Sequence, residues 1–469
     1  MKRLVTLAIL ATLVLGMAGT ASAVDLEAKG KIQVQANIMD NSDFLSAKHN
    51  GDQEDDLNFY FRARTQFRFI ANENLMGELY LQYKTRFGTN GANSGSTLGG
   101  NELSVKRAFL QYRFPETEVL VTAGRTNLDL PGAAAGNMVL AGTDGDQIII
   151  QSPITDQIGI AAAFLRYRDN NDIDAAVTPT TASNWQDEFD VFYAALPITI
   201  DGLEATPYFA YGLLGRNAAI GNDAGAGLTA PVVTAFTKNI TAWWAGTSFA
   251  LTMFDPIVFK ADLVYGSVDG DIKANDRSGF GADMSLAYTG FDFVKPKFVF
   301  AYTTGEDDKT DNGSERLPTI ENDFAFGTYY FGGSALFSSD LDNAQQQGFW
   351  TAGLSFEGIS FLDKLTHDVH FLYIKGTNDK DLIKNAGAAG LTSIAADGRF
   401  LTTKDSAFEI DFNTNYQIYD ELAAIVEFGY IDMNLDKGTW ENYKGTDGVA
   451  RAGKDDPALK FAVGLVYEF

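Results

Sequence analysis

The sequence contains no cysteine and only three histidines, His49, His367 and His370. Without cysteine the protein can form neither a disulfide framework nor a thiolate site. His367 and His370 are three residues apart, so on a strand their side chains point to opposite faces. No H-E-x-x-H, Walker or G-x-S-x-G motif is present. We therefore predict no catalytic site, no metal site and no cofactor, and we expect that the protein is not an enzyme.

Basic residues are also scarce. The sequence has 36 Lys and Arg and 61 Asp and Glu, which gives a formal charge of −25. Such an excess of acids repels phosphates, so we exclude nucleic acid as a non-specific partner. The acids cluster at Asp52–Asp56, Asp169–Asp174 and Glu306–Asp311, in stretches that we interpret as loops. Solvated loops are the ordinary meaning of such clusters, and divalent cations that bridge them to lipid phosphates are the alternative.

After residue 23 the sequence has no uninterrupted apolar segment of the ~18 residues that a membrane-spanning helix needs. The first 23 residues are different. Lys2 and Arg3 precede the apolar run Leu4–Ala18, and Ala21-Ser22-Ala23 is typical of a cleavage site. This arrangement predicts a secretory signal peptide at 1–23, followed by a single mature domain at 24–469. A membrane-anchoring helix is the alternative for the first segment.

Apolar and polar residues alternate with a period of two along most of the mature sequence. In Leu57–Ala71, for example, Phe59 and Phe61 fall on one face while Arg62 and Arg64 fall on the other. This period is the mark of a strand with one apolar and one polar face. We identify eighteen such segments, and sixteen is the alternative count.

The connections between these segments alternate in length. Short ones, such as Asn72–Asn74, Phe254–Pro256 and Tyr419–Glu421, follow even strands, and long ones follow odd strands. A transmembrane barrel has tight periplasmic turns and long outer loops, and in lipid a sheet must close on itself. We predict an all-β fold, a transmembrane antiparallel β-barrel of 16–18 strands in the bacterial outer membrane.

The last strand supports this interpretation. Every second residue from Leu459 to Phe469 is apolar, and the sequence stops at Phe469. The stretch resembles the terminal signature of bacterial outer-membrane barrels, which the barrel-assembly machinery recognises. Phe469 is therefore the candidate assembly signal.

One long connection is expected to enter the barrel. The segment 125–145 has no strand pattern and holds Pro131, four glycines and the acids Asp129 and Asp144. A loop of this length inside an ordered sheet is usually functional or disordered. We predict that it folds into the bore and narrows it, and an exposed surface loop is the alternative.

A family resemblance rests on two stretches, Arg107–Tyr112 and Val121–Arg125, the second of which ends in Gly-Arg. They are similar to the strand pair of trimeric outer-membrane porins that precedes the constriction loop. The signal region and the start of the mature sequence are similar to the homotrimeric porins of sulfate-reducing bacteria. The resemblance implies a homotrimer in which each subunit encloses its own water-filled pore.

Charged residues on the polar strand faces are the candidate pore residues. The basic wall is expected to comprise Arg62, Arg64, Arg68, Lys84, Arg86, Arg107, Arg113 and Arg125. The acidic side is expected to comprise Asp129, Asp144 and Asp146. Opposite charges across a narrow aqueous gap produce a transverse field that orients dipolar solutes. Solvated lumen residues paired with nearby acids are the alternative.

These patterns predict a porin for the passive diffusion of ions and small hydrophilic solutes. A substrate-specific outer-membrane channel is one alternative, and it should show an aromatic track along the lumen. A structural or adhesive surface protein without pore activity is another, and it should show no conductance.

Overall fold

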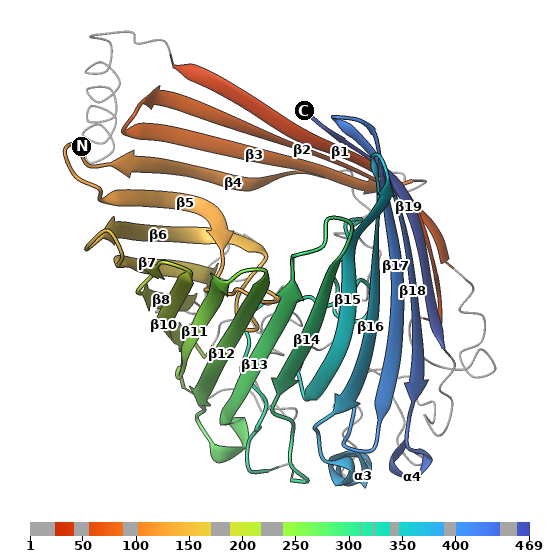
Figure 1. Ribbon diagram of the computed structural model, residues 1–469. Coiled ribbons are helices and arrows are strands. Elements are labelled where there is room, and N and C mark those ends of the chain that lie inside the picture. The colour runs from red at the N-terminus through yellow and green to blue at the C-terminus, as the bar shows by residue number, and fades with distance from the viewer. Residues whose placement is uncertain are drawn as a thin grey trace.

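The computed structural model describes residues 24–41, 56–87, 102–169, 188–216, 238–309, 311–321, 324–337, 347–388, 400–440 and 457–469. The predicted signal peptide lies outside them. The described strands form one antiparallel sheet that wraps around the molecule (Figure 1). The strands are β1 (Asp25–Asp40), β2 (Asp56–Asn72), β3 (Leu75–Arg86), β4 (Glu102–Arg113), β5 (Leu120–Leu128), β6 (Thr143–Pro153), β7 (Gly159–Asp169), β8 (Glu188–Ala195), β9 (Ile198–Ile200), β10 (Leu203–Leu214), β11 (Ile240–Phe254), β12 (Ile257–Asp269), β13 (Arg277–Tyr288), β14 (Lys295–Thr303), β15 (Phe349–Leu362), β16 (Leu365–Gly376), β17 (Ser406–Tyr419), β18 (Leu422–Asn434) and β19 (Ala458–Glu468).

The sheet closes between its first and last strands. β1 pairs with β19 over ten residue pairs, with Val34 opposite Leu465, and on its other edge it pairs with β2. Backbone hydrogen bonds between Gly30 and Phe469 extend the closure to the C-terminal residue. Closure pairs the first strand with the last, so neither is left as an open edge with unpaired backbone N–H and C=O groups.

β8 and β9 together occupy the place of one strand. Both pair with β10, and they are separated by Leu196 and Pro197. Proline has no N–H and breaks a ladder where it falls. Counted in this way, the barrel has eighteen strands, which confirms the higher of the two predicted counts.

The connections sort by length as predicted. The short connections, such as 73–74, 201–202 and 363–364, all lie at one end of the barrel, the short-connection rim. The strand ends that the long connections join are at the other end, the long-connection rim, together with η1 (Lys273–Asn275), α3 (Lys380–Ala388) and α4 (Lys437–Trp440). No helix in the described ranges has the length and apolar character needed to cross a membrane.

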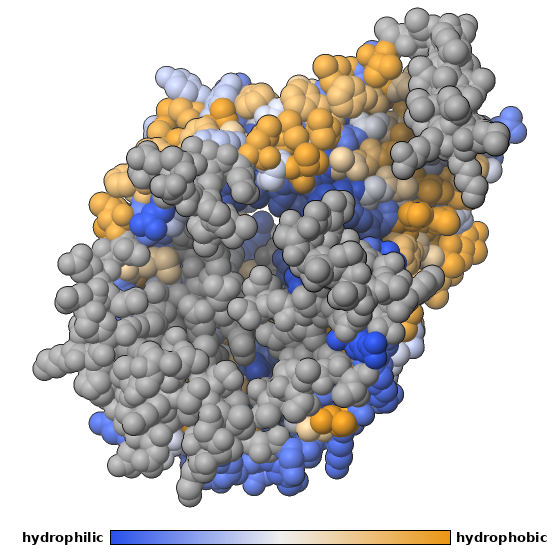
Figure 2. Space-filling view, turned by 180° about the vertical axis from the view of Figure 1, so that it is seen from behind, coloured by the Kyte–Doolittle hydropathy of each residue, from blue (hydrophilic) through white to orange (hydrophobic). Residues whose placement is uncertain are grey.

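The outward face of the barrel is apolar. Phe59, Ile150, Leu354 and Leu465 occupy outward positions and are 43–50% exposed. In the space-filling view, hydrophobic side chains gather along the upper part of the outer surface, and hydrophilic ones lie in the recess below them (Figure 2). Phe61 and Leu79 lie on this same outward face and are not buried in a dry interior.

The inward face differs between the two sides of the barrel. On β1–β4 it is polar, as predicted. On β10–β18 it is apolar near the long-connection rim, where Ala210, Trp244, Ile374 and Ile431 are completely buried. The expectation of a wet inner face around the whole barrel was therefore wrong for this side. The reason is that two segments inserted from the long-connection rim pack against it and form a hydrophobic core inside the barrel.

Candidate functional site

The first inserted segment is 129–142, between β5 and β6. It crosses the bore to strands that are not its neighbours in the sheet. The backbone N–H groups of Ala133 and Ala134 donate to the Asp262 carboxylate on β12 at 2.8 and 2.7 Å. Asn137 donates to the hydroxyl of Tyr208 on β10 at 3.0 Å. The strand wall thus supplies the groups that hold this segment inside the barrel.

Asp129 lies at the base of this segment. Its carboxylate accepts from Gly142 N–H at 2.7 Å and from the Asn127 side-chain amide. Leu130 N–H donates to Leu140 C=O nearby at 2.9 Å. The described contacts of Asp129 are local, and its expected place across a gap from the basic wall stays a prediction. Its carboxylate closes the neck of the inserted segment.

A second inserted segment, described at 311–321 and 324–337, lies between β14 and β15, where the sequence predicted an ordinary long loop. Its backbone N–H groups donate to wall carboxylates: Thr328 to Asp411 at 2.7 Å, and Tyr329 and Tyr330 to Glu409 at 3.1 Å. Acidic residues on the inward face of β17 are therefore anchors for this segment.

A buried ion pair adds to this anchoring. Glu427 on β18 accepts from Ala335 N–H at 2.7 Å and from the Ser334 hydroxyl at 2.5 Å. Lys460 on β19 lies 2.9 Å from Glu427 and donates to Thr328 C=O at 3.0 Å. The Lys460 and Glu427 side chains are 0% and 1% exposed, so each buried charge is stabilised by the opposite charge of the other.

The two inserted segments pack as one body. Ile320 N–H donates to Val139 C=O at 2.8 Å, and Ala325 N–H donates to Ala135 C=O at 2.9 Å. Their apolar side chains fill the space next to β10–β18. Burial of one large apolar side chain contributes about 1.5–3 kcal/mol, against roughly 1 kcal/mol for a hydrogen bond. Hydrophobic burial therefore supplies most of the attachment, and the carboxylates fix its position.

The polar wall opposite this body contains Arg62 and Arg64. Arg62 donates to the amide oxygen of Gln33 at 2.9 Å, and Arg64 donates to that of Gln82 at 2.7 Å. In the described part of the protein the side chains that accept from them are neutral, so these hydrogen bonds do not compensate the two positive charges. The Arg62 guanidinium lies 4.3 Å from the ring centre of Phe337, at the end of the second inserted segment.

Other members of the predicted basic wall occupy different levels. Arg68 pairs with Glu78 at 3.1 Å, and Arg113 pairs with Glu118 at 2.6 Å, both close to the short-connection rim. Lys84 lies beside Arg62 and its ammonium is 5.1 Å from the Phe337 ring. The inward position of Arg86 places it opposite Tyr60, near the long-connection rim.

Asp144 does not face the basic wall across a gap. It contacts Arg107 directly at 2.6 Å and Lys106 at 2.8 Å, and its side chain is 5% exposed. Lys106 was missed in the sequence because alternation assigns it to the outward face. A bulge between Tyr80 and Leu81 of β3 and their β4 partners makes Lys106 an extra residue.

Arg125 and Asp146 are also placed differently from the prediction. They are direct partners across β5 and β6, 3.6 Å apart, and not members of opposed walls. Asp146 alternates with Ile148 and Ile150, which are 50% and 49% exposed on the outer surface. By strand alternation this ion pair lies outside the bore.

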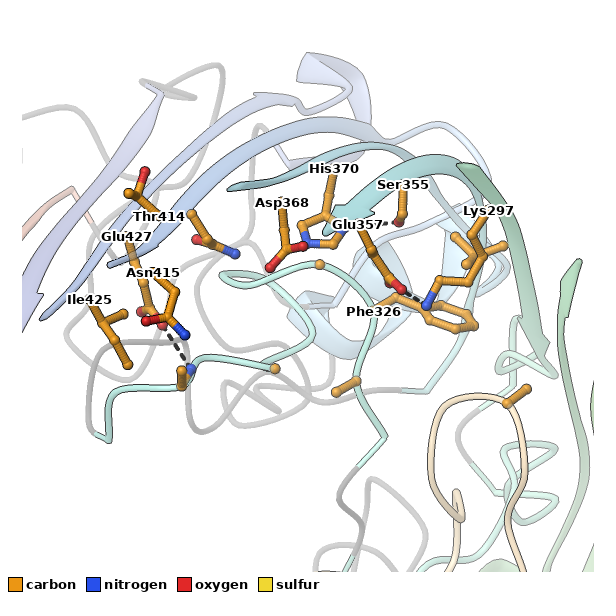
Figure 3. Close-up of a pocket in the computed structure, with 17 residues that line it drawn as sticks. Lys297, Phe326, Ser355, Glu357, Asp368, His370, Thr414, Asn415, Ile425 and Glu427 are labelled. Carbon is orange, nitrogen blue, oxygen red and sulfur yellow. Dashed lines mark hydrogen bonds and ion pairs between the residues drawn. The ribbon is translucent and has the colours of Figure 1, made fainter. Parts of the chain in front are cut away.

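A cavity of about 380 Å³ lies between the second inserted segment and the wall strands β14–β18. Figure 3 shows its polar side chains pointing from the wall toward the inserted segment. Lys297 and Glu357 form an ion pair there, and His370 Nδ1 hydrogen-bonds to the Ser355 hydroxyl at 2.9 Å. Among the described residues no carboxylate is hydrogen-bonded to His370, so the Ser355–His370 pair lacks the third group of a catalytic relay.

The acidic loop near residues 306–315 is described only in part. Burial alone would raise the pKa of Asp307, but the Lys309 N–H and the Asn312 amide donate to its carboxylate and bring the pKa below its usual value. Burial raises the pKa of Glu315, and the charges of Asp307 and Glu306 add to this effect. The described residues contain no group of three or more metal-ligating side chains.

Comparison with known proteins finds likeness only among solved structures. No family model matches this sequence, and no curated protein matches it. A BenF-like porin from Pseudomonas fluorescens has a TM-score of 0.55 and 10% identity, over 95% of this protein and 98% of that one. The outer membrane protein OprD from Pseudomonas aeruginosa has a TM-score of 0.52 and 13% identity, over 95% and 94%. OccK8 (OprE) from the same organism has a TM-score of 0.52 and 12% identity, over 95% and 98%.

These likenesses extend over almost the full length of both proteins, and their low identity limits them to the fold. They agree with the predicted class, an antiparallel barrel of the outer-membrane type. The finer resemblance, to homotrimeric porins of sulfate-reducing bacteria, receives no support from them. The protein thus has the closed eighteen-stranded fold of outer-membrane porin structures.

Proposed function

We propose that this protein is an outer-membrane porin that lets ions and small hydrophilic solutes diffuse through its barrel. One observation carries the proposal: a closed barrel has an apolar outer face and, on β2–β4, a polar inner face opposite an inserted body. The outer face suits lipid and the inner face suits water. The short-connection rim would be periplasmic and the long-connection rim extracellular.

In this proposal the solute path runs between the basic wall and the two inserted segments. Arg62 and Lys84 lie closest to the inserted body, through Phe337, and we assign the narrowest section to this region. Arg64 is the next inward residue after Arg62 on β2. Arg68, Arg86 and Arg113 would lie along the path above and below it. Arg107 is on the same wall but is compensated by Asp144.

The protein's partners are part of the same proposal. The family resemblance in the sequence favours a homotrimer with one pore in each subunit. Phe469 ends the closing strand and would be recognised by the barrel-assembly machinery. Its ring covers Gly30 so closely that a Cβ there would lie 2.2 Å from the ring. We also expect divalent cations to bridge the acidic outer loops to lipid phosphates.

Single-channel recording in planar bilayers tests the function. Purified protein should give stepwise conductance that stays open at low voltage, and the reversal potential under a salt gradient should report its ion preference. An absence of conductance steps from folded, heat-modifiable protein would contradict the porin proposal and favour a structural or adhesive role.

A substrate-specific channel is the second candidate, and the cavity beside the second inserted segment favours it. Liposome swelling with sugars of graded size separates the two. A general pore should show rates that fall smoothly with solute size. A specific channel should admit one solute class faster than smaller molecules of another class.

A further inference from the structure

β4 and β5 separate before they reach the long-connection rim. Their ladder ends at Ala108 and Arg125, whereas β4 begins at Glu102 and β5 continues to Leu128. The bulge that makes Lys106 an extra residue lies in the separated part of β4. Beyond this point the two strands are not paired with each other, so side chains have to close the wall.

Charged and amide side chains fill the separation. We define the polar seam as Lys106, Arg107, Arg125, Asn127, Asp144 and Asp146. Asp144 is central, because it accepts from both Lys106 and Arg107. Arg107 also donates to Asn127 at 3.1 Å, and Arg125 donates to the backbone carbonyl of Asp144 at 3.2 Å. The polar seam is therefore continuous from the lumen side of β4 to the outer surface.

The outer end of the polar seam is exposed. Arg125 and Asp146 are 3.6 Å apart, and their side chains are 44% and 65% exposed. Their neighbours on the outward face of β6, Ile148 and Ile150, are 50% and 49% exposed. The ion pair thus lies on the surface that faces the membrane.

Its level on the barrel follows from the register with β4. Arg125 is opposite Ala108, which lies between outward apolar residues on both sides along the strand. Leu110 is nearer the short-connection rim, and Val105 and Leu103 are nearer the long-connection rim; all three are 49–69% exposed. The Arg125–Asp146 pair therefore lies within the apolar band, where a charge that faces lipid is strongly unfavourable.

The charges continue across the next two strands. Arg166 on β7 is opposite Asp146 and forms a bidentate pair with Asp190 on β8, at 2.8 and 2.9 Å. The outward side chains near the same rim on β1 and β2 are apolar, as Ile38 and Leu57 show. A change from apolar to charged side chains thus marks β5–β8 as a distinct sector of the outer surface.

We propose that this sector, the outer face of β5–β8, is covered by a second copy of the same protein in the membrane. Its charges alternate in sign from strand to strand: Arg125, Asp146, Arg166 and Asp190. Lipid phosphates could match the arginines but would leave Asp146, whose side chain is 65% exposed, facing an anionic surface, while Asp190 is covered and paired with Arg166. A second copy of this protein carries both signs and can match both. The proposal deepens the expected homo-oligomer and rests on the proposed location in the outer membrane.

Site-specific photo-crosslinking in intact cells tests this interface. The photoreactive residue p-benzoylphenylalanine is placed at Ile148, inside the sector, and at Leu465 on β19 as the matched control. The two positions are 50% and 48% exposed and both point outward. Irradiation at position 148 should give a product of twice the subunit mass whose peptides come only from this protein. Position 465 should give at least tenfold less of it.

Equal yields at the two positions, or a product at position 148 that contains a different protein or only lipid, would overturn the proposal. A second measurement tests the interface if the photoreactive variants fold poorly. Since the sequence has no cysteine, Ile148→Cys and Leu465→Cys each accept a single nitroxide label. In bilayers the label at 148 should be several times less accessible to oxygen than the label at 465, and equal accessibility would contradict the interface.

Conductance measurements distinguish a failure of the proposed interface from a failure of the proposed porin function. A channel that conducts normally but yields no crosslink at position 148 would overturn the interface alone. A crosslinked assembly that never conducts would leave the interface in place and contradict the porin.

Discussion

At the residue scale, Arg62 and Arg64 are the positions where charge should decide ion preference. Each donates to a glutamine, so removal of their charges leaves no carboxylate unpaired. A unit charge in water interacts with an ion 4 Å away by about 1 kcal/mol. We expect Arg62→Gln with Arg64→Gln to change the permeability ratio severalfold toward cations, measured as a reversal potential under a salt gradient.

Arg113→Gln is the control for this prediction. Arg113 pairs with the exposed Glu118 near the short-connection rim, and at physiological salt screening acts over ~8 Å. Its loss should leave the reversal potential nearly unchanged. If the double variant also keeps the reversal potential of the original protein, these arginines do not line the narrow section.

Alternation in the sequence predicts side-chain direction only where the ladder is regular. It places Arg62, Arg64 and Lys84 on the inward face, in agreement with the register. It fails for Lys106, because a bulge adds one residue and alternation cannot reveal a bulge. Arg125 was predicted to belong to the basic wall of the pore, whereas its own alternation with Ala123 and Val121 places it outward.

At the scale of elements, the second inserted segment depends on the buried Lys460–Glu427 pair. Lys460→Met would leave the Glu427 carboxylate buried without its counter-charge. Breaking a buried pair by removing one partner costs about 3–5 kcal/mol. We expect a lower unfolding temperature and more frequent brief closures in single-channel traces.

The double variant Lys460→Met with Glu427→Gln is the matched control, because it removes both charges and keeps a side-chain acceptor for Ala335 N–H. It should recover much of the lost stability. A single variant as stable as the double variant would show that the pair does not hold the segment.

The strands and their connections were predictable from the sequence, but the path of the second inserted segment was not. Period two and loop length specify which residues form strands, and they carry no information on where a long loop goes. A usable signal was present on the inward rows of β16 and β17. Leu372 and Ile374 are apolar where a wet lumen would demand polar residues, and Glu409 and Asp411 interrupt the pattern on β17. Apolar inward rows indicate that something covers them.

At the scale of the whole molecule, the barrel is half channel and half packed domain. β2–β4 present a polar inner face, whereas the long-connection half of β10–β18 packs against the inserted body as a soluble protein packs its core. On β1 the inward side chains of Gln33 and Gln35 are buried and hydrogen-bonded to the second inserted segment. The inserted body is therefore part of the folded core as well as a restriction of the bore.

This division leads to a prediction for a variant in which residues 311–337 are replaced by a short Gly-Ser linker. If the segment only narrowed a water-filled bore, its removal would raise conductance and leave stability unchanged. The structure favours a different outcome, because Trp244 donates to Pro318 C=O at 2.8 Å and is completely buried under this segment. Removal would expose Trp244, Leu372 and Ile374 to water, at about 1.5–3 kcal/mol for each large apolar side chain. We expect a marked fall in unfolding temperature and a red shift of tryptophan fluorescence, together with noisy conductance. A stable, quiet and wider pore would contradict this picture of a packed half-barrel.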